Sequence, residues 1–169
     1  IVGFGTVGSG IYKILSSEVD SHPILKEIEI AKIAVKDLNK KRDIELDNNL
    51  LTDDPFKLIN DPSIDVIVEV MGGVDLAKDI ILQSLKLGKS VVTANKAVIA
   101  RYGEEIYKTA SKEGVYILSE AAVCGGIPII EPLKRSLKSN SIKKMVGIIN
   151  GTTNFILSKM TNEKADYKE

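Results

Sequence analysis

Ile1-Val2-Gly3-Phe4-Gly5-Thr6-Val7-Gly8 places two apolar residues directly before the pattern G-x-G-x-x-G. The pattern alone is a weak signal, but here it follows a strand start, and apolar residues then recur at helical spacing up to Leu15. A strand, a glycine turn and a helix in this order are typical of a βαβ unit that binds a dinucleotide. Glycine is needed because the backbone must approach a pyrophosphate held at the helix N-terminus. The alternative is a turn that only joins a strand to a helix.

The sequence beyond this turn alternates short Ile- and Val-rich runs with stretches of helical period, which predicts a parallel sheet covered on both faces. The expected strands are residues 28–35, 66–70, 90–93, 115–118 and 145–149. The expected helices start at Pro55 after an Asp54 cap, after a cap at Asp75, near Glu104 and at Pro128, and Gly88 and Gly114 end two of them. We expect residues 39–49 to form a surface loop rather than a partner site. The fold class is therefore α/β, a Rossmann-type doubly wound parallel sheet over residues 1–118, followed by the beginning of a second domain over 119–169.

Composition excludes several classes of protein. The 169 residues carry 23 basic and 23 acidic side chains, so no basic footprint for nucleic acid is present. Hydrophobic residues make up 44% and charged residues 27%, as in an ordinary soluble domain. The single cysteine, Cys124, cannot form an internal disulfide, and no apolar run is long enough for a membrane span. We expect a cytoplasmic protein without a membrane partner. Since the sequence begins without an initiator Met or a signal peptide, we also expect it to be a fragment of a longer chain.

An acidic residue after the second strand commonly binds the ribose hydroxyls of a dinucleotide, and Asp37 occupies that region. It lies 29 residues beyond Gly8, longer than the usual ~20, so an insertion around residues 16–23 must be accommodated. Four cations surround it: Lys36, Lys40, Lys41 and Arg42. They could hold a ribose 2′-phosphate, which favours NADP, or belong to a solvated turn. The choice between NAD and NADP stays open.

The segment Thr93-Ala94-Asn95-Lys96 follows an expected strand, so it projects from the carboxyl edge where doubly wound sheets bind ligands. With Gly72 and Gly73 after the preceding strand, it could line the nicotinamide end of the site. Hydride transfer to an aldehyde needs a proton donor for the developing alkoxide, and the Lys96 ammonium could supply the proton and stabilise the charge. The alternative is an ordinary surface lysine.

Four segments together resemble homoserine dehydrogenases: the opening glycine turn, Thr93-Ala94-Asn95-Lys96, Glu120-Ala121-Ala122-Val123 with Gly125-Gly126-Ile127-Pro128-Ile129-Ile130, and Gly147-Ile148-Ile149-Asn150-Gly151-Thr152-Thr153-Asn154. The last two are far more specific than the glycine turn, and the resemblance covers essentially the whole chain. That family reduces aspartate 4-semialdehyde to homoserine with NAD(P)H, in the route to threonine, methionine and isoleucine. The resemblance also implies that residues 119–169 begin an α+β domain for substrate binding and dimerisation, and that the complete protein is a homodimer acting on a small molecule.

Carried over position by position, the resemblance makes Lys96 a catalytic lysine and places Thr93 and Asn95 near the nicotinamide. It makes Glu120 a catalytic and substrate-contacting residue, and Gly151 and Thr152 substrate contacts. A monovalent cation, usually sodium, would be held largely by main-chain oxygens of Glu120, Val123, Gly125 and Ile127. The alternatives are a helix-capping Glu120 and a structural glycine-threonine turn. We expect Cys124, flanked by small residues, to be inert packing.

Family members continue beyond the Asn-Gly-Thr-Thr-Asn loop into an acidic segment of the form Asp-x-x-Gly-x-Asp-x-x-x-Lys, and residues 155–169 contain no such pattern. We therefore expect the second domain to be incomplete and turnover by the 169 residues alone to be impaired. Two other functions stay open. One is a semialdehyde-class aldehyde dehydrogenase, which needs a nucleophilic cysteine, and the other is a non-catalytic nucleotide-binding or regulatory module.

Overall fold

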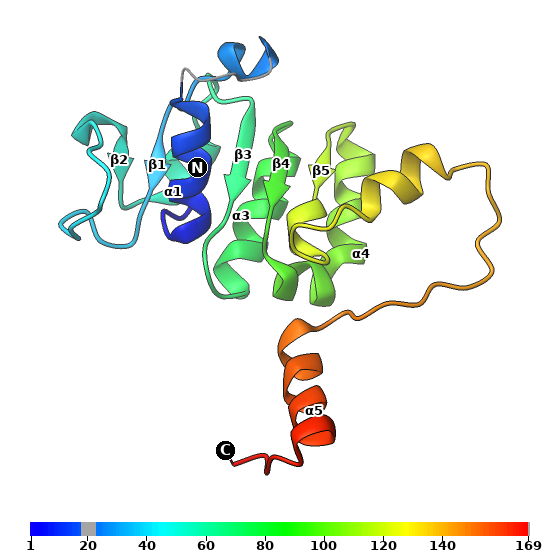
Figure 1. Ribbon diagram of the computed structural model, residues 1–169. Coiled ribbons are helices and arrows are strands. Elements are labelled where there is room, and N and C mark those ends of the chain that lie inside the picture. Colours follow the sequence, from blue (N-terminus) through cyan, green and yellow to red (C-terminus); the bar gives the residue numbers. More distant parts are fainter. Residues whose placement is uncertain (18–22, 169) are drawn as a thin grey trace. The chain divides into compact units, whose positions relative to one another are not determined.

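A computed structural model describes residues 1–17 and 23–168, so part of the expected insertion around residues 16–23 lies outside the described residues. The chain divides into two compact units, Ile1–Val123 and Cys124–Glu169. Figure 1 shows the elements in sequence colours. The strands are β1 (Ile33–Ala34), β2 (Leu51–Thr52), β3 (Val66–Glu69), β4 (Ser90–Thr93) and β5 (Ile117–Leu118). The α-helices are α1 (Thr6–Leu15), α2 (Pro55–Ile59), α3 (Asp75–Lys86), α4 (Lys96–Glu113) and α5 (Gly151–Glu163). Short 3₁₀ turns cover Pro23–Glu27, Asn48–Leu50 and Glu120–Ala122, and a π-helical turn covers Pro132–Ser136.

The first unit is built on a parallel sheet. β1 pairs with β2, and β3, β4 and β5 pair in that order, all in parallel. Val2 joins the two sets through parallel bridges to Ala34 on one side and Glu69 on the other. The sheet order is therefore β2-β1-Val2-β3-β4-β5. From Val2 at the centre the chain first adds β1 and β2 on one side of the sheet, and then returns to add β3, β4 and β5 on the other side. The predicted doubly wound α/β fold is confirmed, and its topological switch point lies at Val2, immediately before the glycine turn.

Helices cover both faces of this sheet. Figure 1 shows α1 in front of the sheet, with α3 and α4 behind strands β3 to β5, and α3 contacts both α2 and α4. The core between sheet and helices is aliphatic, and its largest fully buried side chains include Ile33, Leu58, Ile67, Ile80 and Ile106. The strands are continuous apolar runs because both of their faces are covered.

Local signals fix most helix ends. Asp54 caps α2 by accepting from the Phe56 N–H at 2.9 Å, as predicted, and Pro55 occupies the first helical position. Gly88 and Gly114 both take positive φ values, +77° and +70°, after α3 and α4. The predicted cap at Asp75 is wrong, because Val74 precedes α3 and Asp75 already lies in its first turn.

Three predicted elements of the first unit differ clearly in length. The expected strand over residues 115–118 is only Ile117–Leu118. The expected strand over residues 28–35 is only Ile33–Ala34, since its neighbours β2 and Val2 are themselves too short to extend the ladder. The expected helix near Glu104 instead begins at Lys96, because the Asn95 side chain accepts from the Val98 N–H at 3.2 Å and caps a helix of 18 residues.

The second unit contains α5 and the π-helical turn of Pro132–Ser136, which takes the place of the longer helix expected from Pro128. The expected strand over residues 145–149 is wrong: this segment is irregular, and Met145, Val146, Ile148 and Ile149 are exposed. No strand in the described part of the chain pairs with it, and an isolated strand leaves its backbone groups unpaired. None of the described helices is long and apolar enough to cross a bilayer.

Candidate nucleotide-binding and catalytic site

Five chain segments leave the sheet of the first unit at one edge. Because all its strands are parallel, their carboxyl ends meet there, which is where doubly wound folds bind ligands. These segments are the glycine turn after Val2, residues 36–37 after β1, residues 70–73 after β3, residues 94–96 after β4 and residues 119–120 after β5. The fold thus gathers most of the site residues predicted from sequence at a single edge.

The three glycines of the glycine turn differ in their surroundings. Gly3 takes φ +101°, and a Cβ on it would lie 2.8 Å from the backbone of Val70 and Met71. A Cβ on Gly8 would lie 2.2 Å from the Gly3 carbonyl oxygen, so α1 packs directly against the strand. A Cβ on Gly5, by contrast, meets nothing within 4 Å. The three glycines therefore serve different purposes, and only Gly5 faces open space.

The N-terminus of α1 is free to receive a charge. Gly5 occupies the N-cap position without a side-chain cap, and the first turn carries no acidic residue. Thr6 and Val7 are exposed there. Uncapped N–H groups and the positive end of the helix dipole favour an anion at this point, so the chemistry of these residues suits a pyrophosphate.

A buried carboxyl that the sequence reasoning missed lies at the end of β3. Glu69 is fully buried, and its Oε2 accepts from the Thr93 hydroxyl at 2.6 Å. Its Oε1 accepts from the Met71 N–H at 3.0 Å and from the Asn95 side-chain amide at 3.4 Å. Burial raises the pKa of Glu69, and the hydrogen bonds from Thr93, Asn95 and Met71 partly oppose this. The available signal was an acidic residue inside an otherwise apolar strand.

Asn95 ties two loops together. Besides Glu69, its side-chain amide donates to the Gly73 carbonyl at 2.9 Å and the Met71 carbonyl at 3.4 Å, while its oxygen caps α4. The Thr93 hydroxyl is also engaged, because it accepts from the Asn95 N–H at 3.0 Å. The side chains of Thr93 and Asn95 are therefore occupied within the protein, and their contact with a nicotinamide stays a prediction.

Lys96 is the first residue of α4 and is exposed. The backbone of Lys96 is held in place by the Asn95 cap of the helix, whereas its side chain is not packed in the core. It shares the carboxyl edge with Gly72 and Gly73, both exposed, of which Gly73 takes φ +88°. An ammonium here can reach a ligand without crossing the core.

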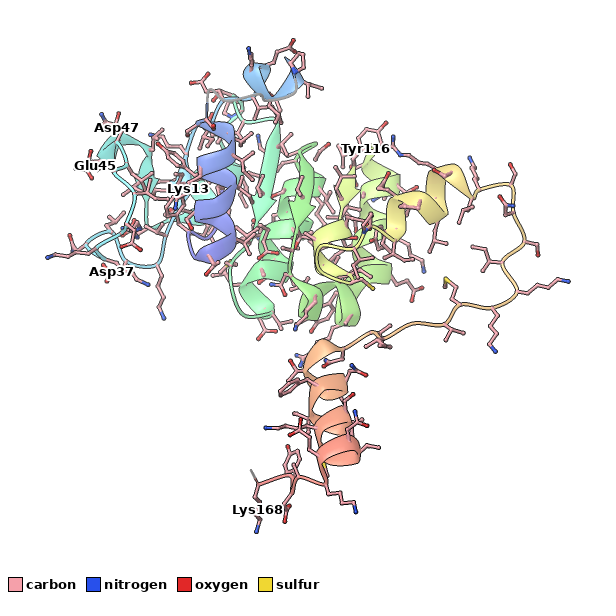
Figure 2. All side chains as sticks on the ribbon, in the orientation of Figure 1. Lys13, Asp37, Glu45, Asp47, Tyr116 and Lys168 are labelled. Atoms are coloured by element: carbon pink, nitrogen blue, oxygen red, sulfur yellow. The ribbon has the colours of Figure 1, made fainter. Side chains whose placement is uncertain are left out.

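The loop after β1 carries the residues predicted to bind the ribose hydroxyls or the 2′-phosphate of the cofactor. Lys36 and Asp37 are exposed, and Figure 2 labels Asp37 on this loop. One Asp37 carboxylate oxygen accepts from the Asn39 N–H at 2.9 Å. Arg42 folds back and donates to the Asp37 and Lys40 carbonyls at 2.6 and 2.8 Å, so it shapes the loop instead of facing outward. Lys36, Lys40 and Lys41 are exposed cations of the same loop.

The predicted cation and substrate residues are divided between the two units. Glu120 begins a 3₁₀ turn after Ser119, and its carbonyl accepts from the Val123 N–H at 3.0 Å. Gly125 and Ile127 belong to the second unit, where Gly151 and Thr152 start α5 beneath an Asn150 cap. No cluster of three or more His, Cys, Asp or Glu side chains suited to a metal occurs among the described residues, whereas the predicted set uses main-chain oxygens.

Cys124 is exposed with φ +57°, which corrects the expectation that it is packed. It is the first residue of the second unit, directly after the end of the first. Its small neighbours in the sequence therefore do not bury it.

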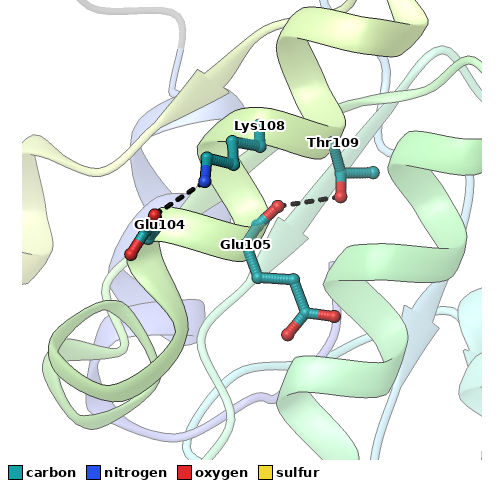
Figure 3. Close-up of polar contacts among 4 residues, drawn as sticks. All are labelled: Glu104, Glu105, Lys108 and Thr109. Atoms are coloured by element: carbon teal, nitrogen blue, oxygen red, sulfur yellow. Dashed lines mark hydrogen bonds and ion pairs between the residues drawn. The ribbon is translucent and has the colours of Figure 1, made fainter.

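A hollow at the surface of α4 is lined by Arg101, Tyr102, Glu104, Glu105, Lys108 and Thr109. Figure 3 shows the contacts there: Lys108 pairs with Glu104 at 2.7 Å, and the Thr109 hydroxyl donates to the Glu105 carbonyl at 2.8 Å. Both are contacts between successive turns of one helix, so the hollow is a solvated helix surface.

Two family models match the chain. A family model described as "Homoserine dehydrogenase, NAD binding domain" matches residues 3–120, and one described as "Homoserine dehydrogenase" matches residues 128–169. The chain belongs to the homoserine dehydrogenase family. A homoserine dehydrogenase from Synechocystis is 53% identical over the whole chain, and one from Bacillus subtilis is 46% identical. The match extends through both units.

Solved homoserine dehydrogenase structures share the fold. A crystal structure from Thiobacillus denitrificans superposes with a TM-score of 0.86 at 42% identity over 99% of the chain, and one from Staphylococcus aureus at pH 6.0 with 0.79 at 40%. The chain spans 39% of the Synechocystis relative and 39% of the Thiobacillus structure. The chain therefore spans well under half the length of these two relatives.

Proposed function

We propose that this chain supplies the nucleotide-binding domain and the beginning of the substrate domain of an enzyme that interconverts L-homoserine and L-aspartate 4-semialdehyde with NAD or NADP. In the cell this would be a cytoplasmic step toward threonine, methionine and isoleucine. One observation carries the proposal: the uncapped N-terminus of α1 and the exposed Lys96 lie at the same carboxyl edge of one sheet. The chain that carries them is a member of the homoserine dehydrogenase family. Family membership favours this function over a thiol-dependent aldehyde dehydrogenase or a non-catalytic module.

The nicotinamide cofactor, when bound, supplies or accepts the hydride at the carbonyl carbon of the substrate. Gly3, Gly5 and Gly8 form the turn that binds the pyrophosphate at the start of α1: Gly3 and Gly8 let the backbone pack closely, and Gly5, with Thr6 and Val7, faces the anion. Gly72 and Gly73 border the nicotinamide. In the direction of reduction, the Lys96 ammonium donates a proton to the aldehyde oxygen and stabilises the charge that develops there. In the direction of oxidation, the neutral Lys96 amine accepts the hydroxyl proton of homoserine and becomes the ammonium. Glu120, Gly151 and Thr152 bind the substrate, and residues 119–169 begin the domain for substrate binding and dimerisation.

The loop after β1 determines cofactor preference in this proposal. Asp37 binds the ribose hydroxyls, and Lys36 is exposed beside it, whereas Arg42 is engaged with loop carbonyls. Lys36 is therefore the cation best placed for a 2′-phosphate. Lys36→Ala should weaken NADPH binding more than NADH binding in fluorescence titrations. Equal effects on the two nucleotides would make the loop a solvated turn.

A monovalent cation such as sodium is the second proposed ligand, held by main-chain oxygens of Glu120, Val123, Gly125 and Ile127. Oxygen ligands suit a hard cation. Activity measured in sodium-free buffer should rise on adding sodium chloride but not on adding tetramethylammonium chloride, which controls for ionic strength. Equal responses to both salts would remove the cation from the proposal.

The activity itself is tested in the complete natural polypeptide that carries this sequence. Homoserine-dependent reduction of NAD(P), followed at the nicotinamide absorbance, is expected for the wild type and lost for Lys96→Ala. A protein that binds the nucleotide but does not oxidise homoserine would support the non-catalytic alternative. Activity that a thiol-blocking reagent abolishes without unfolding the protein would support the aldehyde dehydrogenase.

A further inference from the structure

Glu69 stands out in the first unit because it is a fully buried acid at the point where the site begins. It ends β3 in register with Thr93 at the end of β4, and both side chains are buried. Burying a carboxyl is costly unless its oxygens are hydrogen-bonded. If packing were the only requirement at this position, Val or Ile would be buried there at a lower cost in free energy.

Within residues 1–17 and 23–168, the hydrogen bonds to this carboxyl come from the segments that line the carboxyl edge. Oε2 accepts from the Thr93 hydroxyl, and Oε1 accepts from the Met71 N–H and the Asn95 amide. Three donors converge on two oxygens, and the two nitrogen donors cannot accept a carboxyl proton in return. These donors favour the ionised form and partly oppose the effect of burial, but burial is the larger cause and leaves the pKa of Glu69 above its ordinary value.

The contacts continue from Glu69 toward Lys96. Thr93 accepts from the Asn95 N–H, and Asn95 then caps α4 and latches the loop after β3 at the carbonyls of Met71 and Gly73. Lys96 is the residue directly after this cap. One buried carboxyl thereby ties together the loop that borders the predicted nicotinamide site and the helix start that carries the predicted proton donor.

We infer that Glu69 is a positioning residue: through Thr93 and Asn95 it holds Lys96 and the loop of residues 71–73 in the geometry that hydride transfer requires. This inference rests on the proposed function, since it concerns the same reaction. Glu69 touches neither reacting group in this role. A displacement of about 1 Å in a catalytic group can lower a rate by about 100-fold, so loss of the network should appear mainly in kcat.

Two substitutions disrupt these hydrogen bonds while nearly preserving the volume of the side chain. Glu69→Gln keeps the size of the side chain but removes its charge and replaces one acceptor oxygen by an amide donor. Turned toward Met71, this donor opposes the Met71 N–H; turned toward Thr93, it reverses the native hydrogen bond, so that Thr93 must accept instead of donate. Thr93→Val removes the hydroxyl, so Glu69 Oε2 loses its donor and the Asn95 N–H loses its acceptor. Thr93→Ser retains the hydroxyl and serves as the conservative rescue.

Lys89 provides a matched control at the opposite end of β4. Its side chain is buried, and its ammonium donates to the carbonyls of Asp61 and Ile64, far from the carboxyl edge along the strand. Lys89→Met removes a buried polar network of similar extent. It should lower the melting temperature and leave kcat unchanged, which separates instability from mispositioning.

The experiment measures kcat and KM for homoserine and the dissociation constant of NADPH, in the complete natural polypeptide, with kcat normalised to the number of NADPH-binding sites. Glu69→Gln and Thr93→Val are expected to lower kcat at least tenfold and to change the homoserine KM less than threefold, while Thr93→Ser recovers most of the loss. A Glu69→Gln kcat within twofold of wild type, or a Thr93→Ser kcat as low as that of Thr93→Val, would overturn the inference.

Failure of the proposed function gives a different result. If the wild type binds NADPH but does not oxidise homoserine, the function is wrong, and the positioning role is judged from NADPH affinity. Glu69→Gln and Thr93→Val should then weaken NADPH binding at least fivefold, with Thr93→Ser and Lys89→Met close to wild type. Equal affinities across these variants would refute the role of Glu69, as would a wild type that binds no nucleotide.

Discussion

Substitutions at three glycines of the opening turn and helix, Gly5, Gly8 and Gly10, should affect cofactor affinity and the free energy of unfolding separately. Gly5 has φ −88° and open space at its Cβ position, so Gly5→Val should change the free energy of unfolding by less than about 1 kcal/mol. The added side chain nevertheless occupies the approach to the α1 N-terminus. We expect at least ~10-fold weaker dinucleotide binding, which corresponds to about 1.4 kcal/mol.

Gly8→Ala should behave in the opposite way. Its Cβ would lie 2.2 Å from the Gly3 carbonyl oxygen and 3.3 Å from Val70 Cγ2, and the first of these is backbone that cannot rotate aside. Overpacking of this kind costs about 1–3 kcal/mol. Gly10→Ala is the matched control: it lies in the same helix, its Cβ meets nothing within 4 Å, and alanine should gain about 0.5–1 kcal/mol there.

Urea denaturation and NADH fluorescence titration on the three variants give both quantities. The expected pattern is lost affinity with intact stability for Gly5→Val, lost stability for Gly8→Ala, and slightly raised stability for Gly10→Ala. Wild-type affinity in a folded Gly5→Val variant would refute the pyrophosphate role of the turn. Equal stability of Gly8→Ala and Gly10→Ala would refute the close packing of α1 on the sheet.

The remaining predictions concern single side chains. Lys96→Ala should lower kcat ~100-fold or more with little change in NADPH affinity, and Lys96→Arg should not restore it, because guanidinium does not release its proton; steady-state kinetics measure both. Lys89→Ala leaves the carbonyls of Asp61 and Ile64 without their buried donor and should cost about 1–3 kcal/mol in urea denaturation. The pKa of Glu69 is raised in the folded state, so its contribution to stability is full below its unfolded value near 4.5 and is lost as pH rises through the folded value. Wild-type stability measured relative to Glu69→Gln should therefore fall from pH 4.5 toward neutral pH, and an increase would contradict the raised pKa.

The sequence alone was sufficient for features that depend on neighbouring residues. The period of apolar residues predicted α1 and the parallel strands, Asp54-Pro55 predicted the start of α2, and Gly88 and Gly114 marked helix ends. These signals are local, since capping and positive φ values involve residues within one or two turns. The family motifs identified the family for the same reason, because they are read in order along the chain.

The tertiary structure was needed where hydrogen-bond partners lie far apart in the sequence. Glu69 looked like one more strand residue until β3 paired with β4 and brought it to Thr93 and Asn95, which lie 24 and 26 positions away. The Asn95 cap that starts α4 at Lys96 is local and was available in the sequence, but the hydrogen bond from the same side chain to Gly73, 22 positions away, depended on the fold. The strand expected over residues 145–149 did not form, because an apolar run can favour a strand but cannot supply the neighbouring strand that satisfies its backbone.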